Sequence, residues 1–221
     1  MTHTVIIASA TVLLGVVLYA EKGEIRRLLV SSKSALSALF VLAALGAPHS
    51  LPVYDRPLVA GLCLCLVGDI CLAFPQKRMF LAGLLSFLAG HVFYVIAFSR
   101  VAGLGGWTWL GGTATCGFSG WIYLWLRPHL GGMKGPVVLY VIVISAMLIS
   151  AFSVLGHGIL AVPVRWMVIS GAICFYFSDI FVARDRFVRK EFLNRMVGLP
   201  MYYAGQFVLA FSIGMVNWTG P

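Results

Sequence analysis

The chain has 221 residues, of which 61% are hydrophobic and only 10% are charged. A soluble domain of this length carries more charge, because its surface must be hydrated. The composition therefore excludes an ordinary soluble enzyme. It predicts an all-α, polytopic membrane protein that forms a single integral-membrane domain over residues 1–221.

Spanning a bilayer requires about 20 largely apolar residues. Eight segments of the sequence meet this requirement: 4–20, 28–46, 57–74, 79–99, 107–126, 136–155, 163–182 and 201–217. Prolines stand at four of the expected helix starts, where the missing N–H costs little; these are Pro57, Pro136, Pro163 and Pro200. The connections are short, so we expect about eight transmembrane helices and no separate soluble domain.

The basic residues predict how these helices are oriented. Twelve of the 16 lie in or beside the connections that follow odd-numbered segments: Lys22, Arg26, Arg27, Lys77, Arg78, Arg127, Lys134, Arg184, Arg186, Arg189, Lys190 and Arg195. The opposite side carries only Arg56, Arg100 and Arg165. Because cytoplasmic loops are enriched in Lys and Arg, we expect both termini outside and the odd-numbered connections in the cytoplasm, as in a bacterial inner-membrane protein. This asymmetry also accounts for most of the net charge of +9, so no nucleic-acid partner is inferred.

A weak internal similarity relates the two halves of the chain. "VGDICLAF" with "HVFYVIAF" resembles "FSDIFVA" with "YYAGQFVLAF", and the two aspartates are 110 positions apart. Two parallel four-helix repeats, 1–105 and 106–221, would produce this pattern. Chance similarity between apolar helices would produce it too.

Two carboxylates interrupt these apolar segments. Asp69 lies five residues before Phe74 and Asp179 lies five residues before Arg184, so each is about 7–8 Å inside the cytoplasmic end of its helix at 1.5 Å per residue. Lys33 lies at a similar depth in the second segment. An ionisable group that faces lipid costs roughly 2.5–3.5 kcal/mol on insertion scales, so such groups usually face a cavity or one another. The alternative is a purely structural Asp–Lys pair.

Further polar side chains occur at comparable depths on other predicted helices: Tyr140, Tyr202, Tyr203 and Gln206 near the cytoplasmic side, with His91 and Tyr94 nearer the middle. This convergence predicts a functional cavity toward the cytoplasm. His91 could instead be a buried hydrogen-bonding histidine, and the paired tyrosines could be interfacial anchors. One membrane histidine and two acids are too few for a clear metal site, and the five cysteines form no CxxC pair. We expect no metal and no cofactor.

The polar residues carry a resemblance to the lysoplasmalogenase family, the YhhN-like eight-helix membrane proteins. The motifs that carry it are an early Lys in the second helix (Lys33), GDxxL (Gly68, Asp69, Leu72), HxxY (His91, Tyr94), SDxxLA (Ser178, Asp179) and YYxxQ (Tyr202, Tyr203, Gln206). The departures, Phe181 and Val182 in the fourth motif and Ser34 after Lys33, remove no chemical group. The resemblance covers most of the chain.

The resemblance implies hydrolysis of the vinyl ether of a lysoplasmalogen taken from the bilayer. The products would be a fatty aldehyde and glycerophosphoethanolamine or glycerophosphocholine. Such a reaction needs one proton-bearing acid and one anion, which two carboxyls and one Lys can supply together near neutral pH. We therefore expect Asp69 and Asp179 to be catalytic, in roles that the sequence leaves open. Lys33, His91, Tyr94, Tyr140, Ser178, Tyr202, Tyr203 and Gln206 would bind or orient the substrate.

Two other classes of protein fit the same residues. Proton-coupled transporters also place acids and a histidine within the membrane. A structural membrane protein would keep the polar groups apart. The oligomeric state is not predicted.

Overall fold

The computed structural model describes residues 3–216 and contains eight long helices. They are α1 (His3–Lys22), α2 (Arg26–Leu45), α3 (Pro52–Leu72), α4 (Lys77–Ser99), α5 (Gly106–Leu126), α6 (Lys134–Leu155), α7 (Val162–Ala183) and α8 (Phe192–Gly214). Two short 3-10 turns, η1 (Arg127–His129) and η2 (Gly131–Met133), connect α5 to α6, and a π-helical segment, η3 (Arg184–Val188), extends α7. The part of the chain that is described has no strand, which confirms the all-α prediction.

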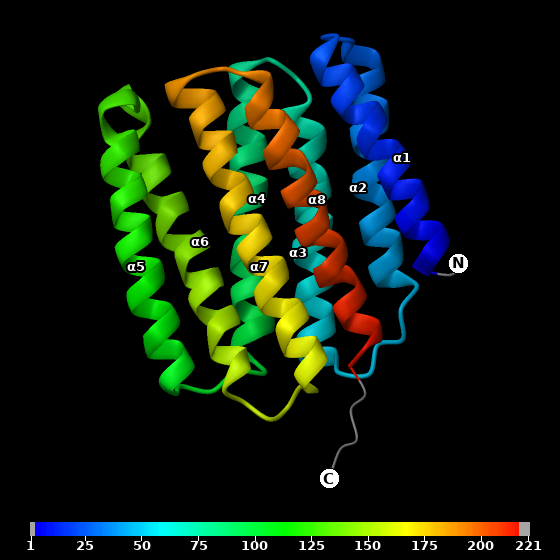
Figure 1. The fold of residues 1–221 in the computed structure, drawn as a ribbon, viewed down its shortest axis with the longest axis vertical. Coiled ribbons are helices and arrows are strands. Elements are labelled where there is room, and N and C mark those ends of the chain that lie inside the picture. The colour runs from blue at the N-terminus through cyan, green and yellow to red at the C-terminus, as the bar shows by residue number, and fades with distance from the viewer. Residues whose placement is uncertain (1–2, 217–221) are drawn as a thin grey trace.

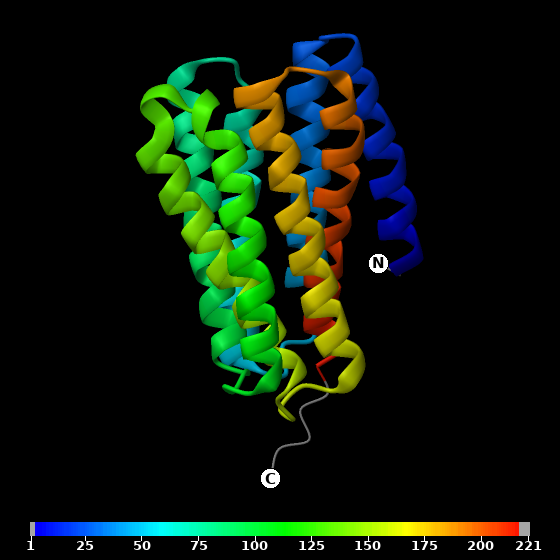
Figure 2. The same cartoon turned by 60° about the vertical axis from the view of Figure 1, so that its left-hand side comes forward.

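The helices run alternately up and down (Figure 1). Helices α3, α4, α7 and α8 form the middle of the bundle, α2 and α6 flank them, and α1 and α5 lie outermost (Figures 1 and 2). The connections that follow α1, α3, α5 and α7 all lie at the upper end of Figure 1. We call this end, which carries the twelve basic residues, the basic end.

Apolar side chains cover the surface and several charged or polar side chains are buried, which is the reverse of a soluble protein. Large apolar side chains such as Leu42, Leu85, Trp121 and Ile142 are exposed, whereas Lys33, Asp69 and His91 are buried. Six of the described helices are long and apolar enough to cross a membrane: α1, α2, α4, α6, α7 and α8. The protein is therefore an integral membrane protein.

Helices α3 and α5 have the length of the others, 21 residues each, but not the same apolar character. Helix α3 contains Asp55, Arg56 and Asp69, and α5 is interrupted by several glycines and threonines. Both pack along their neighbours in the bundle, α3 against α4 and α5 against α6. Eight helices are thus present as predicted, although composition alone identifies only six of them as spans.

Two predicted helix starts are wrong. Pro57 and Pro200 lie inside α3 and α8 rather than at their starts. Helix α3 begins at Pro52, where Asp55 Oδ2 accepts a hydrogen bond from the Leu51 N–H at 2.9 Å. Helix α7 ends at Ala183, one residue after the predicted end, and the π-helical η3 follows it to Val188. Asn217, the last residue predicted for the eighth segment, lies outside the described residues.

The early start of α8 has a local cause in the connection from α7. Asn194, in the first turn, donates to the Arg189 carbonyl at 2.8 Å and to Asp185 at 3.2 Å. Arg195 contacts Asp185 at 2.9 Å. These contacts satisfy polar groups at the helix start, so the helix extends eight residues before Pro200.

Glycines bring two helix pairs into close contact. A Cβ atom on Gly61 of α3 would lie 2.3 Å from the Tyr94 ring of α4, and one on Gly205 of α8 would lie 2.8 Å from the Gly171 carbonyl oxygen of α7. Small residues at such positions allow membrane helices to approach closely, where van der Waals packing holds them together. The two aspartates lie on these pairs, Asp69 on α3 and Asp179 on α7.

We expect Gly205→Ala to lower the free energy of unfolding by about 1–3 kcal/mol, because the new methyl group meets backbone that cannot rotate away. Thermal unfolding in detergent measures the change. Gly117→Ala is the matched control, since a Cβ there has no neighbour within 4 Å. Equal stability of the two variants would contradict the close α7–α8 packing.

Candidate active site

One pocket lies within the bundle near the basic end, and we call it the central pocket. Helices α2 to α8 and η3 all contribute to its lining, which is mostly aliphatic and aromatic. Six of the residues predicted for the site line it: Lys33, Asp69, Tyr140, Ser178, Asp179 and Tyr202. Exposed Arg186 and 40% exposed Val182, about one helical turn apart on η3 and α7, also line it, so the pocket reaches the surface beside this helix near the basic end.

Asp69 is surrounded by hydrogen-bond donors. The Lys33 ammonium lies 3.3 Å from Oδ1, and the hydroxyls of Ser37 and Tyr202 each donate to Oδ2 at 2.6 Å. The Asp69 side chain is 2% exposed and that of Lys33 is 4% exposed. A cation and two hydroxyl donors stabilise the ionised form of a carboxyl group. This environment is suited to a buried carboxylate anion.

Ser37 is the residue of this cluster that sequence reasoning missed. It lies four residues after Lys33, on the same face of α2, and that spacing is the only signal in the sequence. Its hydroxyl also contacts the Tyr203 hydroxyl at 3.2 Å. Tyr203 thus reaches Asp69 through Ser37 and does not contact the carboxylate directly.

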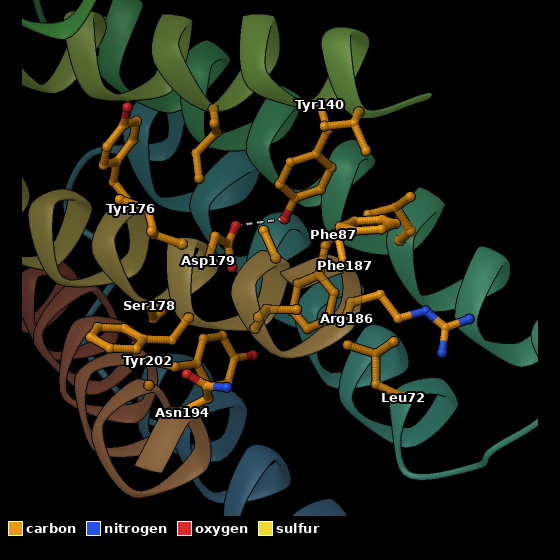
Figure 3. A pocket seen from close by; sticks show the side chains of 18 of the residues that line it. Leu72, Phe87, Tyr140, Tyr176, Ser178, Asp179, Arg186, Phe187, Asn194 and Tyr202 are labelled. Atoms are coloured by element: carbon orange, nitrogen blue, oxygen red, sulfur yellow. Dashed lines mark hydrogen bonds between the residues drawn. The ribbon is translucent and has the colours of Figure 1, made fainter. Parts of the chain in front are cut away.

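Asp179 has a different environment. The Tyr140 hydroxyl donates to its Oδ2 at 2.6 Å, and the two side chains point toward each other from α6 and α7 (Figure 3). The Asp179 side chain is 16% exposed, against 2% for Asp69. His91 Nε2 lies 3.8 Å from the same oxygen, too far for a hydrogen bond. Asp179 is therefore the more accessible carboxyl, and Tyr140 is its only hydrogen-bond donor among the described residues.

The orientation of His91 determines which of its nitrogens carries hydrogen. Nδ1 lies 2.7 Å from the Phe87 carbonyl oxygen, which can only accept, so Nδ1 donates. In a neutral ring Nε2 is then a bare acceptor, and it has no hydrogen-bond partner although His91 is fully buried. Two acceptors that face each other favour a proton on one of them.

A series of ring contacts connects the two carboxyl environments. Tyr202, which donates a hydrogen bond to Asp69, packs against Phe175 with ring centroids 5.2 Å apart. Phe175 in turn packs against His91 at 4.5 Å, and the His91 ring lies 5.4 Å from that of Tyr140. The aspartates thus belong to one continuous aromatic cluster rather than to two separate sites.

Three of the predicted residues make no hydrogen bond to either carboxyl: Ser178, which lines the pocket, and Tyr94 and Gln206, which lie beside it. Tyr94 donates to Gln206 Oε1 at 2.7 Å and contacts the Cys65 thiol at 3.7 Å. The Ser178 hydroxyl donates to the Phe175 carbonyl at 2.7 Å, back along its own helix. Within residues 3–216 no group of three His, Cys, Asp or Glu side chains is arranged to hold a metal ion.

A network of charged side chains connects η3 to α8 at the rim of the central pocket. Arg184 contacts Glu191 at 2.8 Å, and Asn194 accepts from Arg184 at 2.7 Å. Arg186, Asn194 and Arg195 line the pocket at this end. In the sequence these arginines indicate only the orientation of the helices, because neither their pairing nor their position at a rim can be read from it.

These features, an eight-helix membrane bundle with two carboxyls in one apolar pocket, match a known class of membrane protein. The profile of the YhhN family matches residues 27–213. The chain belongs to the YhhN family, as its motifs predicted.

Several curated relatives share this similarity. A lysoplasmalogenase of Mycobacterium bovis is 29% identical over 174 residues, which are 76% of this chain and 63% of the relative. Lysoplasmalogenase TMEM86A of Bos taurus is 32% identical over 180 residues, 79% of this chain and 72% of the relative. Lysoplasmalogenase TMEM86B of Mus musculus is 31% identical over 156 residues, which are 70% of this chain and 62% of the relative. The chain thus spans less than two thirds of the mycobacterial relative, and no solved structure matches it.

Proposed function

We propose that this protein hydrolyses the vinyl ether bond of a lysoplasmalogen, releasing a fatty aldehyde and glycerophosphoethanolamine or glycerophosphocholine. The observation that carries the proposal is the pair of carboxyls in one apolar pocket, held by contrasting partners. Three donors surround Asp69, whereas Asp179 has one donor and faces a bare imidazole nitrogen. The similarity to lysoplasmalogenases of Mycobacterium bovis and Bos taurus supports the same reaction.

The hydrogen bonds favour one division of roles between the two carboxyls. Asp179 would carry the proton, because neutral His91 offers it no donor and because it is the carboxyl more exposed to the pocket. Asp69 would remain the anion, held by Lys33, Ser37 and Tyr202. This parallels the division of work between the two carboxyls of a glycosidase.

The proposed reaction begins when Asp179 transfers its proton to the alkene carbon one bond removed from the ether carbon. A C–H bond forms, and the adjacent carbon and ether oxygen share the positive charge of an oxocarbenium ion. The Asp69 carboxylate stabilises this cation in a site of low dielectric. Water adds to the charged carbon and returns a proton to Asp179. The resulting hemiacetal loses its hydroxyl proton and the glycerol oxygen gains one as the C–O bond to glycerol breaks, which releases the aldehyde and the glycerophosphodiester.

Turnover by the purified protein tests the proposal. Lysoplasmalogen in detergent should give one aldehyde per glycerophosphodiester, whereas the 1-acyl ester analogue should remain intact. A proton-coupled transporter, the alternative from the sequence, would instead accumulate solute in proteoliposomes with an imposed proton gradient. Uptake without aldehyde release would replace the hydrolase proposal by the transporter.

We further propose that the basic end faces the cytoplasm and that both termini lie outside, on the strength of the basic-residue asymmetry. In intact cells, an impermeant thiol reagent should label Leu104→Cys, a residue that is 88% exposed, but not Lys190→Cys. Both substitutions are made in a background without the five native cysteines. Labelling of residue 190 from outside would reverse the orientation. The bacterial inner membrane remains a prediction.

A further inference from the structure

Arg186 differs from its arginine neighbours in the charged network. Arg184 and Arg189 each contact Glu191 at 2.8 Å, and Arg195 contacts Asp185 at 2.9 Å. Arg186 has no carboxylate within ion-pair distance among the described residues, yet it lines the central pocket. Figure 3 shows its side chain extending on the side of the pocket near Leu72. An exposed guanidinium at a pocket rim is therefore available to an anionic ligand.

The guanidinium is also held in place. Its central carbon lies 4.2 Å from the centre of the Phe80 ring, another residue of the lining. A cation over a ring face keeps the N–H groups at its edges free, and these form a planar fork that matches two phosphate oxygens. Because the stack already orders the side chain, less conformational entropy is lost when an anion binds.

The position of Arg186 relative to Asp179 fits a phospholipid. The two residues are seven positions apart on one continuous helix, α7 with η3, which corresponds to about 10 Å of rise. In a lysoplasmalogen the phosphorus and the reacting alkene are separated by an extended chain of about 7 Å, at about 1.2 Å advance per bond. The side chains of Asp179 and Arg186, which both line the pocket, span the remaining few ångströms.

Lys33 does not compete for this role. Its ammonium is 3.3 Å from Asp69 and is almost wholly buried, so it neutralises the catalytic anion of the proposed mechanism. Of the sequence-based alternatives for Lys33, carboxylate partner or phosphate ligand, the contact favours the first. The phosphate ligand must then come from the rim.

We propose that Arg186, stacked on Phe80, binds the phosphate of the lysophospholipid and so sets the depth at which the vinyl ether enters the central pocket. This inference rests on the proposed function and adds a headgroup site to it.

The test compares two alkenyl substrates that differ in the phosphocholine headgroup, 1-O-alkenylglycerophosphocholine, which carries it, and 1-O-alkenylglycerol, which does not. Arg186→Gln should lower kcat/KM for the first by roughly 10–100-fold, mainly through KM, as expected when a hydrogen-bonded charge is lost. The value for 1-O-alkenylglycerol should not change. Arg186→Lys keeps the charge but not the planar fork, so its kcat/KM for the first substrate should lie between those of the unmodified protein and Arg186→Gln. Lys190→Gln, the same charge change at an exposed position outside the pocket, should behave like the unmodified protein.

A binding measurement keeps this test separate from the proposed reaction. By calorimetry in detergent, 1-acyl-lysophosphatidylcholine should bind more tightly than 1-monoacylglycerol, and Arg186→Gln should remove the difference. Inorganic phosphate should not bind comparably, since it lacks the chain that fills the pocket. Equal losses in Arg186→Gln and Lys190→Gln, or equal losses on both substrates, would overturn the headgroup site. So would phosphate binding as tight as that of the lysolipid. Binding as expected without turnover by any variant would overturn the hydrolase proposal and leave the site standing.

Discussion

Asp179→Asn should reduce lysoplasmalogen turnover by about 10³-fold, within the range that general acid catalysis typically contributes. The amide can still accept the hydrogen bond from Tyr140, so the packing of α6 against α7 should persist, but it has no proton to give to carbon. Aldehyde release by the purified variant, set beside its thermal unfolding curve, measures both quantities.

Glu24→Gln is the matched control for this variant, because it makes the same change to an exposed acid in the α1–α2 connection. It should turn over at the unmodified rate. An Asp179→Asn protein that keeps most of its activity would show that Asp179 is structural. In that case the assignment of acid and anion between the two carboxyls would be wrong.

Asp69→Asn should lose turnover and, unlike Asp179→Asn, should also lose stability. Removing one member of a buried ion pair leaves the other charge unpaired, at a cost of about 3–5 kcal/mol. Here the charge left behind is the Lys33 ammonium, which is 4% exposed. We expect a lowered thermal midpoint together with a loss of at least about 10²-fold in turnover, since the cation of the reaction would lose its counter-ion.

The double variant Lys33→Met/Asp69→Asn separates the two effects of Asp69→Asn. It removes both charges, so most of the stability should return, while turnover should not. Recovery of both would mean that Asp69 serves only to neutralise Lys33. Combining Asp69→Asn with Asp179→Asn should cost little more turnover than either change alone, because residues that act in one step are strongly non-additive.

Hydropathy and local motifs predicted much of this molecule. The eight helices, their alternation and the gathering of basic residues at one end follow from apolar length and charge, which are properties of short segments. Motif spacing similarly pointed to Asp69 and Asp179. Prolines were misleading at Pro57 and Pro200, because polar contacts made by Asp55 and Asn194 extend those helices beyond the apolar core.

The assignment of roles within the site could not be predicted in this way. It depends on partners that are far apart in the chain: Tyr202 is 133 positions from Asp69, and Tyr140 is 39 positions from Asp179. The Nδ1 contact of His91 with Phe87 is local to α4, but the role of the bare Nε2 depends on Asp179, which lies opposite it on α7. The parallel repeat stays a prediction, although Gly61 and Gly171, eight residues before their respective aspartates, mark corresponding close contacts.

Where the central pocket reaches the surface, its lining includes an exposed valine, Val182, and, about one helical turn further on, an exposed arginine, Arg186. For the proposed reaction this matters after the chemistry, when a single amphiphile has become two molecules with opposite solubilities. The aldehyde can dissolve directly in the hydrocarbon beside Val182, and the glycerophosphodiester can diffuse into water past Arg186. Each product then leaves directly into the phase in which it is soluble. Partitioning of the two products into different phases thereby lowers their concentrations at the site and favours net hydrolysis.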